Sequence, residues 1–112
     1  MQYSNPQQHL VVNDWPYGAV RTVATFTIEK TRRGERCTRV TVNPKSGQPN
    51  KPKSTVYGKS CRIVTGEDGR TYVAALSQFG FIYITKSDLH YTQETIQPGD
   101  ANFVEVMNLL GS

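Results

Sequence analysis

Three short apolar runs separated by glycine turns, between residues 54 and 84, constrain the fold more than any other part of this sequence. The first turn, residues 66–69, carries Asp-Gly near its apex, where tight hairpins need positive φ angles. The flanking runs, residues 61–65 and 71–76, are rich in β-branched and aromatic residues. Neither face of this hairpin is polar throughout, which predicts that part of this sheet is covered on both sides. The stretch therefore predicts a compact antiparallel meander.

A second turn at Phe79-Gly80 leads into the last run of the meander. The register of this run stays open, because a slip of one residue exchanges the pair Phe81 and Tyr83 for the pair Ile82 and Ile84 on the core face.

The residues before the meander predict a long hairpin. From residue 19 to residue 30, small or apolar side chains recur at every second position, the pattern of a strand with one face on the core. A basic turn over residues 31–35 leads into a second strand, residues 36–43. Residues 10–12 and 89–96 are weaker strand candidates.

Residues 100–110 predict a C-terminal amphipathic helix. Phe103, Val106, Met107 and Leu110 recur at helical spacing, Asp100 is expected to cap the N-terminus, and a glycine at position 111 to end the helix.

A chain of 112 residues is expected to form one domain. The predicted fold is mainly β: a small antiparallel, strongly bent sheet or barrel of five to six strands, with one C-terminal α-helix. Residues 1–9 are polar and are expected to form a flexible tail, with residues 10–112 as the domain. The nearest architectures are the Src-homology-3-like and oligonucleotide-binding barrels.

No combination of residues predicts catalysis. Ser87, Asp88 and His90 are residue types of a catalytic triad, but three groups within four positions of one turn cannot adopt its relay geometry together. Glu67 and Asp68 belong to a hairpin tip, and the glycines match no phosphate-binding or dinucleotide pattern. The chain is predicted to be a non-enzyme without a cofactor.

Cys37 and Cys61 are the only cysteines, and with two distant histidines they give no metal-ligand spacing. A disulfide between these two cysteines is possible only if their strands are neighbours. In a chain without an export signal, free and partly buried thiols are expected instead. No apolar run approaches the ~20 residues of a membrane span. These features predict a cytoplasmic protein without membrane contact.

Positive charge is concentrated in the middle of the chain. Residues 21–70 hold twelve of the thirteen Lys and Arg residues and four acidic residues, a net charge of +8, whereas the residues after them carry −3. Lys and Arg side chains on one surface bind the phosphates of a nucleic acid regardless of its base sequence. Tyrosines on a strand face can stack on unpaired bases.

The preferred interpretation is non-catalytic binding of DNA or RNA through the basic hairpin 30–39 and the Pro/Lys-rich loop 43–53. The predicted nucleic-acid-binding residues are Lys30, Arg32, Arg33, Arg36, Arg39, Lys45, Lys51, Lys53, Tyr57, Lys59 and Tyr72.

Residues 58–73, G-K-S-C-R-I-V-T-G-E-D-G-R-T-Y-V, resemble the KOW-type hairpin of small RNA-binding barrels. The shared features are a glycine turn between two β runs and basic residues before it. No functional residue is carried over from this resemblance.

A protein-interaction module is the alternative interpretation. A basic patch with an acidic helix also suits an adaptor or an inhibitor that binds and regulates a larger protein, for example one that handles nucleic acid. Arginines and exposed aromatic residues are typical of protein hot spots. Val104, Val106 and residues 109–110 of the helix could in addition pair across a homodimer. Competition between nucleic acid and an acidic protein partner for the arginines at 32, 33 and 36 would separate the two interpretations.

Overall fold

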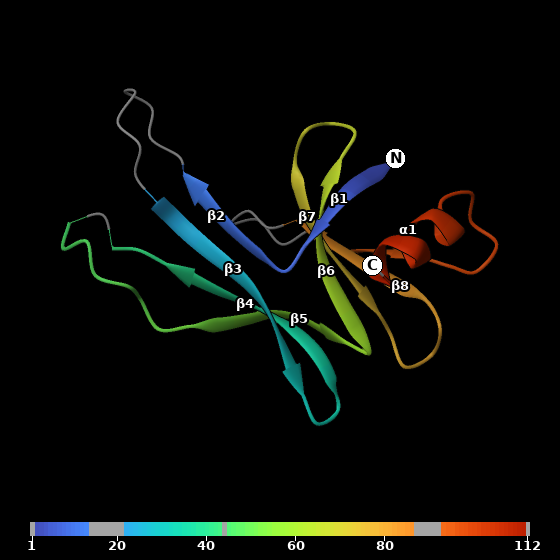
Figure 1. The fold of residues 1–112 in the computed structure, drawn as a ribbon, viewed down its shortest axis with the longest axis horizontal. Helices are drawn as coiled ribbons and strands as arrows, with labels where there is room; N and C mark the ends of the chain where they lie inside the picture. The colour runs from blue at the N-terminus through green and yellow to red at the C-terminus, as the bar shows by residue number, and fades with distance from the viewer. Residues whose placement is uncertain (1, 14–21, 44, 87–92, 112) are drawn as a thin grey trace.

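The computed structural model of the chain describes residues 2–13, 22–43, 45–86 and 93–111, which form two antiparallel sheets and one C-terminal helix (Figure 1). One sheet has the strand order β1-β6-β7-β8-β9, and the other has the order β2-β3-β4-β5. The elements are β1 (Tyr3–Gln7), β2 (His9–Asn13), β3 (Thr22–Thr31), β4 (Gly34–Thr41), β5 (Lys53–Gly58), β6 (Ser60–Gly66), β7 (Thr71–Leu76), β8 (Ile82–Lys86), β9 (Gln93–Ile96) and α1 (Phe103–Leu110).

Two segments of the chain cross from one sheet to the other at a single bent residue. β1 leads into β2 through Gln8, and β5 leads into β6 through Lys59. The Gln8 carbonyl accepts the Ile28 N–H at 2.8 Å, and the Lys59 N–H donates to the Leu76 carbonyl at 2.7 Å. Both bends therefore stay hydrogen-bonded to a neighbouring strand.

The mainly β prediction with one C-terminal helix is confirmed, but of the two predicted forms, a bent sheet or a barrel, the closed barrel is wrong. A barrel needs an uninterrupted ladder of paired strands around its circumference. The two bends divide the ladder into two separate sheets, with nine strands among the described residues instead of five to six.

The central strands β6 and β7 of the five-stranded sheet are covered on both faces, as the sequence predicts for part of this sheet. Helix α1 packs on one face against β1, β6 and β7, and the four-stranded sheet packs on the other face against β6 and β7 (Figure 1). The core under the helix contains Tyr3, Val64, Tyr72, Ala74, Ile82, Ile84, Ile96, Val106 and Leu110. The core between the sheets contains Ala24, Phe26, Cys37, Ile63 and Val73. The structure thus has three layers: helix, sheet and sheet.

The meander forms with the predicted turns. In the β6–β7 hairpin, the Gly66 N–H donates to the Arg70 carbonyl at 2.9 Å, and Gly69 has a φ of +78°. In the next strand, Ile82 and Ile84 are buried under the helix, so Phe81 and Tyr83 lie on the opposite face. This settles the register that the sequence leaves open.

The N-terminal residues differ from the expected flexible tail. Residues 3–7 form β1, which pairs with β6 and buries Tyr3 edge-on against Tyr72, with ring centroids 5.3 Å apart. The pairing is irregular between Ser4 and Gln7, where Asn5 has a φ of +56° and Pro6 follows. The polar composition of this segment suits an edge strand that contributes one side chain to the core.

The helix is shorter than expected, 103–110 instead of 100–110, and Asp100 is not its N-cap. Asn102 occupies the N-cap position, and Asp100 Oδ2 accepts the Gln97 N–H at 2.7 Å, so this carboxylate shapes the preceding turn. Gly111 follows the last helical residue, as predicted. None of the helices in the described ranges has the length and apolar character to cross a membrane.

Both cysteines are free and buried, as expected. Burial raises the pKa of each thiol to about 12, so both are protonated at neutral pH. Residues 19–21 and 89–92 of the predicted strands, and Ser87, Asp88 and His90, lie outside the described residues.

Replacing Gly58 with alanine is expected to destabilise the protein, because a Cβ atom there would overlap the backbone carbonyl of Leu76. We expect the free energy of unfolding to fall by about 1–3 kcal/mol, the usual cost of overpacking. Urea denaturation followed by circular dichroism measures this change. In the control Gly111→Ala, the nearest atoms lie 3.7 Å from the added carbon, and stability should change by less than about 0.5 kcal/mol. Equal stability of Gly58→Ala and the parent protein would contradict the close approach of β5 to β7.

Candidate nucleic-acid interface

The tip of the β3–β4 hairpin, residues 31–34, presents two exposed arginines, Arg32 and Arg33. Thr31 Oγ1 accepts the Arg33 N–H at 3.3 Å and donates to the Gly34 carbonyl at 3.0 Å. Gly34 has a φ of +153°, and a Cβ atom there would overlap the Gly58 carbonyl. The tip is thus a closed turn that rests on the bend between β5 and β6.

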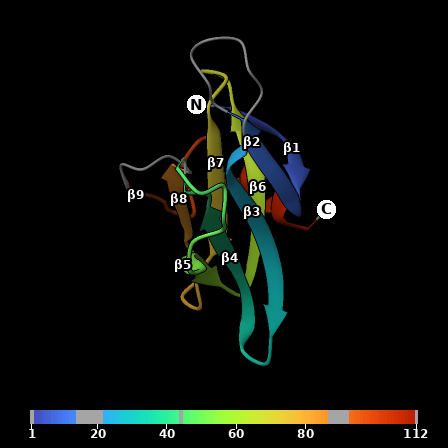
Figure 2. The ribbon, with the colours of Figure 1, turned by 90° about the vertical axis from the view of Figure 1, so that its left-hand side faces the viewer.

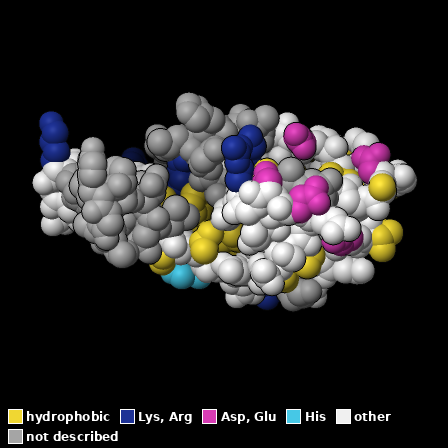
Figure 3. All heavy atoms as spheres, turned by 90° about the horizontal axis from the view of Figure 1, so that it is seen from above, with side chains coloured by type: hydrophobic (Ala, Val, Ile, Leu, Met, Phe, Trp, Pro, Cys, Tyr) yellow, Lys and Arg dark blue, Asp and Glu magenta, His cyan; other side chains and the backbone are white. Residues whose placement is uncertain are grey.

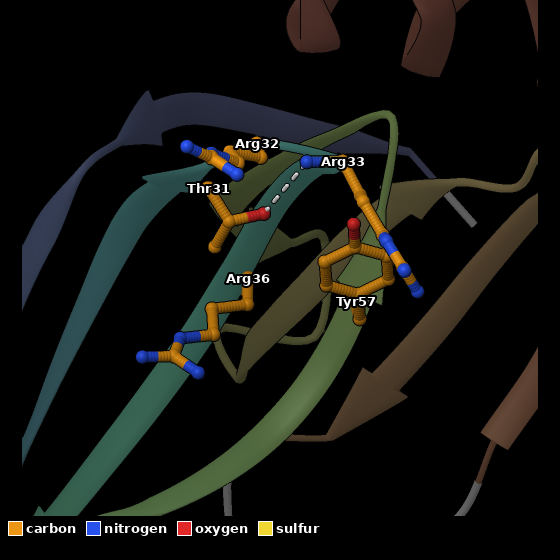
Figure 4. Close-up of a pocket in the computed structure, with 5 residues that line it drawn as sticks. All are labelled: Thr31, Arg32, Arg33, Arg36 and Tyr57. Carbon is orange, nitrogen blue, oxygen red and sulfur yellow. Dashed lines mark hydrogen bonds between the residues drawn. The ribbon is translucent and has the colours of Figure 1, made fainter.

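An open hollow of about 460 Å³ lies on one side of this tip, lined by Thr31, Arg32, Arg33, Arg36 and Tyr57 (Figure 4). Arg33 extends alongside the Tyr57 ring, whereas the Arg36 guanidinium points away from both. Arg36 Nε donates instead to Glu29 Oε2 at 3.0 Å. Tyr57 is 40% exposed, so one part of its ring is open to solvent.

A second hollow of about 360 Å³ is also lined by residues of the tip, together with residues of the β5–β6 bend. Its lining residues are Lys30, Thr31, Gly34, Glu35, Lys59 and Arg62. The two hollows share Thr31. The hairpin tip therefore carries cationic side chains in both hollows. We call this cluster of Lys30, Arg32, Arg33, Arg36 and Lys59 the basic end.

An ion pair that is largely buried connects the two sheets at the second hollow. Glu35 Oε1, on β4, accepts from Arg62 Nη1, on β6, at 2.9 Å, and the side chains are only 10% and 13% exposed. The same oxygen accepts the backbone N–H of Cys61 at 3.2 Å, and Arg62 Nη1 also donates to the Cys61 carbonyl at 2.6 Å. Glu35 thus joins the strand that carries the tip to the sheet that supports it.

The structure brings six of the predicted binding residues together: the five members of the basic end and Tyr57. Lys45 and Lys51 lie near the other end of β4 from the hairpin tip. At about 3.4 Å per strand residue, the length of β4 separates them from the tip by roughly 25 Å. Two backbone hydrogen bonds close the loop that carries these lysines. The Asn43 N–H donates to the Gln48 carbonyl at 2.9 Å, and the Asn50 N–H donates to the Thr41 carbonyl at 2.8 Å. The side chain of Lys53 lies outside the described part of the structure.

Arg39 and Tyr72 do not belong to the candidate interface, because both are buried. The inward face of β4 carries Glu35, Cys37 and Arg39, so Arg39 is 8% exposed. Tyr72 packs in the core under the helix and donates its hydroxyl to Asp68 Oδ2 at 2.6 Å. Neither side chain can offer the open surface that a phosphate or a base needs.

Glu35 and Arg62 are structurally important residues that the sequence does not single out. They are 27 residues apart, and no local pattern links them. Among the described residues, no cluster of three or more His, Cys, Asp or Glu side chains could hold a metal ion.

We expect Tyr72 to titrate well above an ordinary tyrosine. Its hydrogen bond to the Asp68 carboxylate, together with burial, raises the pKa of Tyr72 to about 12 from 10.0, and the same bond lowers the pKa of Asp68. The stability that this bond contributes is therefore lost as the pH rises through about 12, or falls through the lowered pKa of Asp68. Asp68→Asn should return one phenol towards 10 in an ultraviolet absorbance titration, whereas Glu105→Gln, on the helix, should not. An unchanged titration in Asp68→Asn would contradict the bond.

Two glutamates of the four-stranded sheet should differ strongly in their effect on stability. Glu35→Ala removes the carboxylate that accepts from both Arg62 and the Cys61 N–H, and should lower the free energy of unfolding by about 3–5 kcal/mol. Glu29→Ala removes an exposed ion pair with Arg36 and should cost less than about 1 kcal/mol. Chemical denaturation of the two variants compares these values. Similar losses in both would show that the Glu35 pair is not a link between the sheets.

No family model matches the chain, and neither a curated protein nor a solved structure matches it.

Proposed function

We propose that this protein binds nucleic acid, without catalysis, through the basic end. The observation that carries the proposal is that five cationic side chains, spread between positions 30 and 59, are gathered around one hairpin tip. Phosphate binding needs such a cluster of Lys and Arg on one surface.

The charges around the tip support an anionic ligand. The nearby carboxylates, Glu29 and Glu35, are each in an ion pair, with Arg36 and Arg62 respectively. In the part of the chain that the structure describes, no carboxylate pairs with Lys30, Arg32, Arg33 or Lys59. A phosphate that binds these four cations would therefore not have to displace a carboxylate of the described residues.

The distribution of acidic residues also favours binding of an anionic ligand at the basic end. The other acids of the described chain belong to the five-stranded sheet, its turns and the helix, namely Glu67, Asp68, Glu94, Asp100 and Glu105. Figure 3 shows acidic side chains gathered over that half of the molecule on the face seen from above. This separation of charge would orient an approaching polyanion towards the tip.

The double variant Arg32→Ala/Arg33→Ala should weaken nucleic-acid binding about tenfold or more, because it removes two phosphate contacts. Fluorescence anisotropy with labelled DNA and RNA oligonucleotides measures the affinity over a series of salt concentrations. The slope of log K against log salt should fall by about 2 in magnitude. Arg36→Ala should have a smaller effect, since its Nε is held by Glu29.

Lys45→Ala/Lys51→Ala is the matched control, because it removes the same charge from the far end of β4. This control should leave affinity nearly unchanged. Equal losses in both double variants would show that net charge alone attracts the ligand, and an absence of binding by the parent protein would overturn the proposal. A single protein that is captured from lysate in stoichiometric amount with this one, and that is retained after nuclease treatment, would favour the adaptor or inhibitor alternative.

A further inference from the structure

A row of three aromatic side chains begins in the β7–β8 turn and continues into β8: Phe79, Phe81 and Tyr83. The Phe79 and Phe81 rings are stacked, with centroids 6.2 Å apart and an interplanar angle of 13°. Phe81 meets Tyr83 edge to face at 5.0 Å. Phe79, at the end of this aromatic row, is 83% exposed, so a large apolar ring faces solvent.

The turn itself holds the row in place. Ser77 is buried, and its Oγ accepts the N–H groups of Phe79 and Phe81, each at 3.2 Å. The Ser77 N–H donates to the Phe81 carbonyl at 2.8 Å, and Gly80 has a φ of +90°, which glycine adopts without strain. The exposed ring is therefore presented by an ordered turn.

The aromatic row lies next to the basic end. The β7–β8 turn begins immediately after Leu76, whose carbonyl accepts the Lys59 N–H at 2.7 Å. Figures 1 and 2 both show this turn close to the β5–β6 bend and on the same end of the molecule as the β3–β4 tip. Phe81 and Tyr83 alternate with Ile82 and Ile84, so they lie on the sheet face turned away from the helix. The four-stranded sheet, which carries the tip, packs on that same face.

We propose that the aromatic row stacks on unpaired bases of a single-stranded nucleic acid whose phosphates contact the basic end. This inference rests on the proposed function and adds a ligand class to it. Base stacking on aromatic side chains contributes to single-strand binding without regard to sequence. In a duplex the bases are already stacked on one another, so a surface ring such as Phe79 has no free base to contact.

The neighbouring charge favours this ligand over a second copy of the chain. A two-fold dimer built around the aromatic row would place two basic ends close to each other. Like charges brought together across an interface oppose association, whereas a polyanion is attracted to the same cations.

Phe79→Ala tests the inference. Fluorescence anisotropy should show a loss of about tenfold to a hundredfold in affinity for a single-stranded oligonucleotide, and little change for the duplex of the same sequence. Phe79→Trp should keep the affinity, because it keeps a stacking surface. Val104→Ala, which removes another exposed apolar side chain on the helix face, should change neither affinity. Urea denaturation should show that all three variants remain folded.

Three results would overturn the inference while leaving the proposed function intact, provided that Arg32→Ala/Arg33→Ala still weakens binding. They are unchanged single-strand affinity in Phe79→Ala, equal binding of single strand and duplex by the parent protein, and equal losses for both ligands in Phe79→Ala. If Phe79→Ala instead abolished self-association in sedimentation velocity and left binding unchanged, the row would be an interface between copies. Failure of the parent protein to bind any oligonucleotide would overturn the proposed function as well.

Discussion

The carboxylate of Glu35 is the point on which the joint between the two sheets depends. It is buried on β4, and it accepts both a side-chain N–H of Arg62 and a backbone N–H from β6. A buried charge is tolerated only when its hydrogen-bonding capacity is satisfied. Here the partners come from the opposite sheet, so satisfying the charge fixes how the sheets meet. Beside this carboxylate, the absence of a side chain at Gly34 lets the backbone of the hairpin tip approach Gly58, and its absence at Gly58 lets β5 approach Leu76 of β7.

Local patterns in the sequence predict much of the fold. The β6–β7 hairpin with its Asp-Gly turn, the β3–β4 hairpin and the C-terminal helix all depend on residues close to one another in the chain, and all are present. The same holds for the cationic tip: Arg32 and Arg33 lie in a turn that the sequence identifies. The approach of Lys59 and Tyr57 to that tip depends on strand pairing over more than twenty residues.

Other features could not be predicted because they depend on contacts between distant segments. On β4, alternation places Val40 and Arg39 on opposite faces without identifying the buried one; in the structure Glu35, Cys37 and Arg39 are buried and Val40 is partly exposed. The ion pair across the sheets makes this arrangement possible. Neither Gln8 nor Lys59, the residues at which the chain bends, is a glycine or proline, and the two bends give two sheets where the sequence predicts one bent sheet or barrel.

The irregular strand β1 has a consequence for the behaviour of the protein at high concentration. An outer strand normally offers a row of free backbone groups to which another chain can add, and this is a common route to aggregation. In β1 the pairing is interrupted between Ser4 and Gln7, Asn5 takes a left-handed conformation, and Pro6 has no N–H to donate. A strand shaped in this way is a poor template for the addition of another strand, so this margin of the five-stranded sheet does not invite pairing with a second chain.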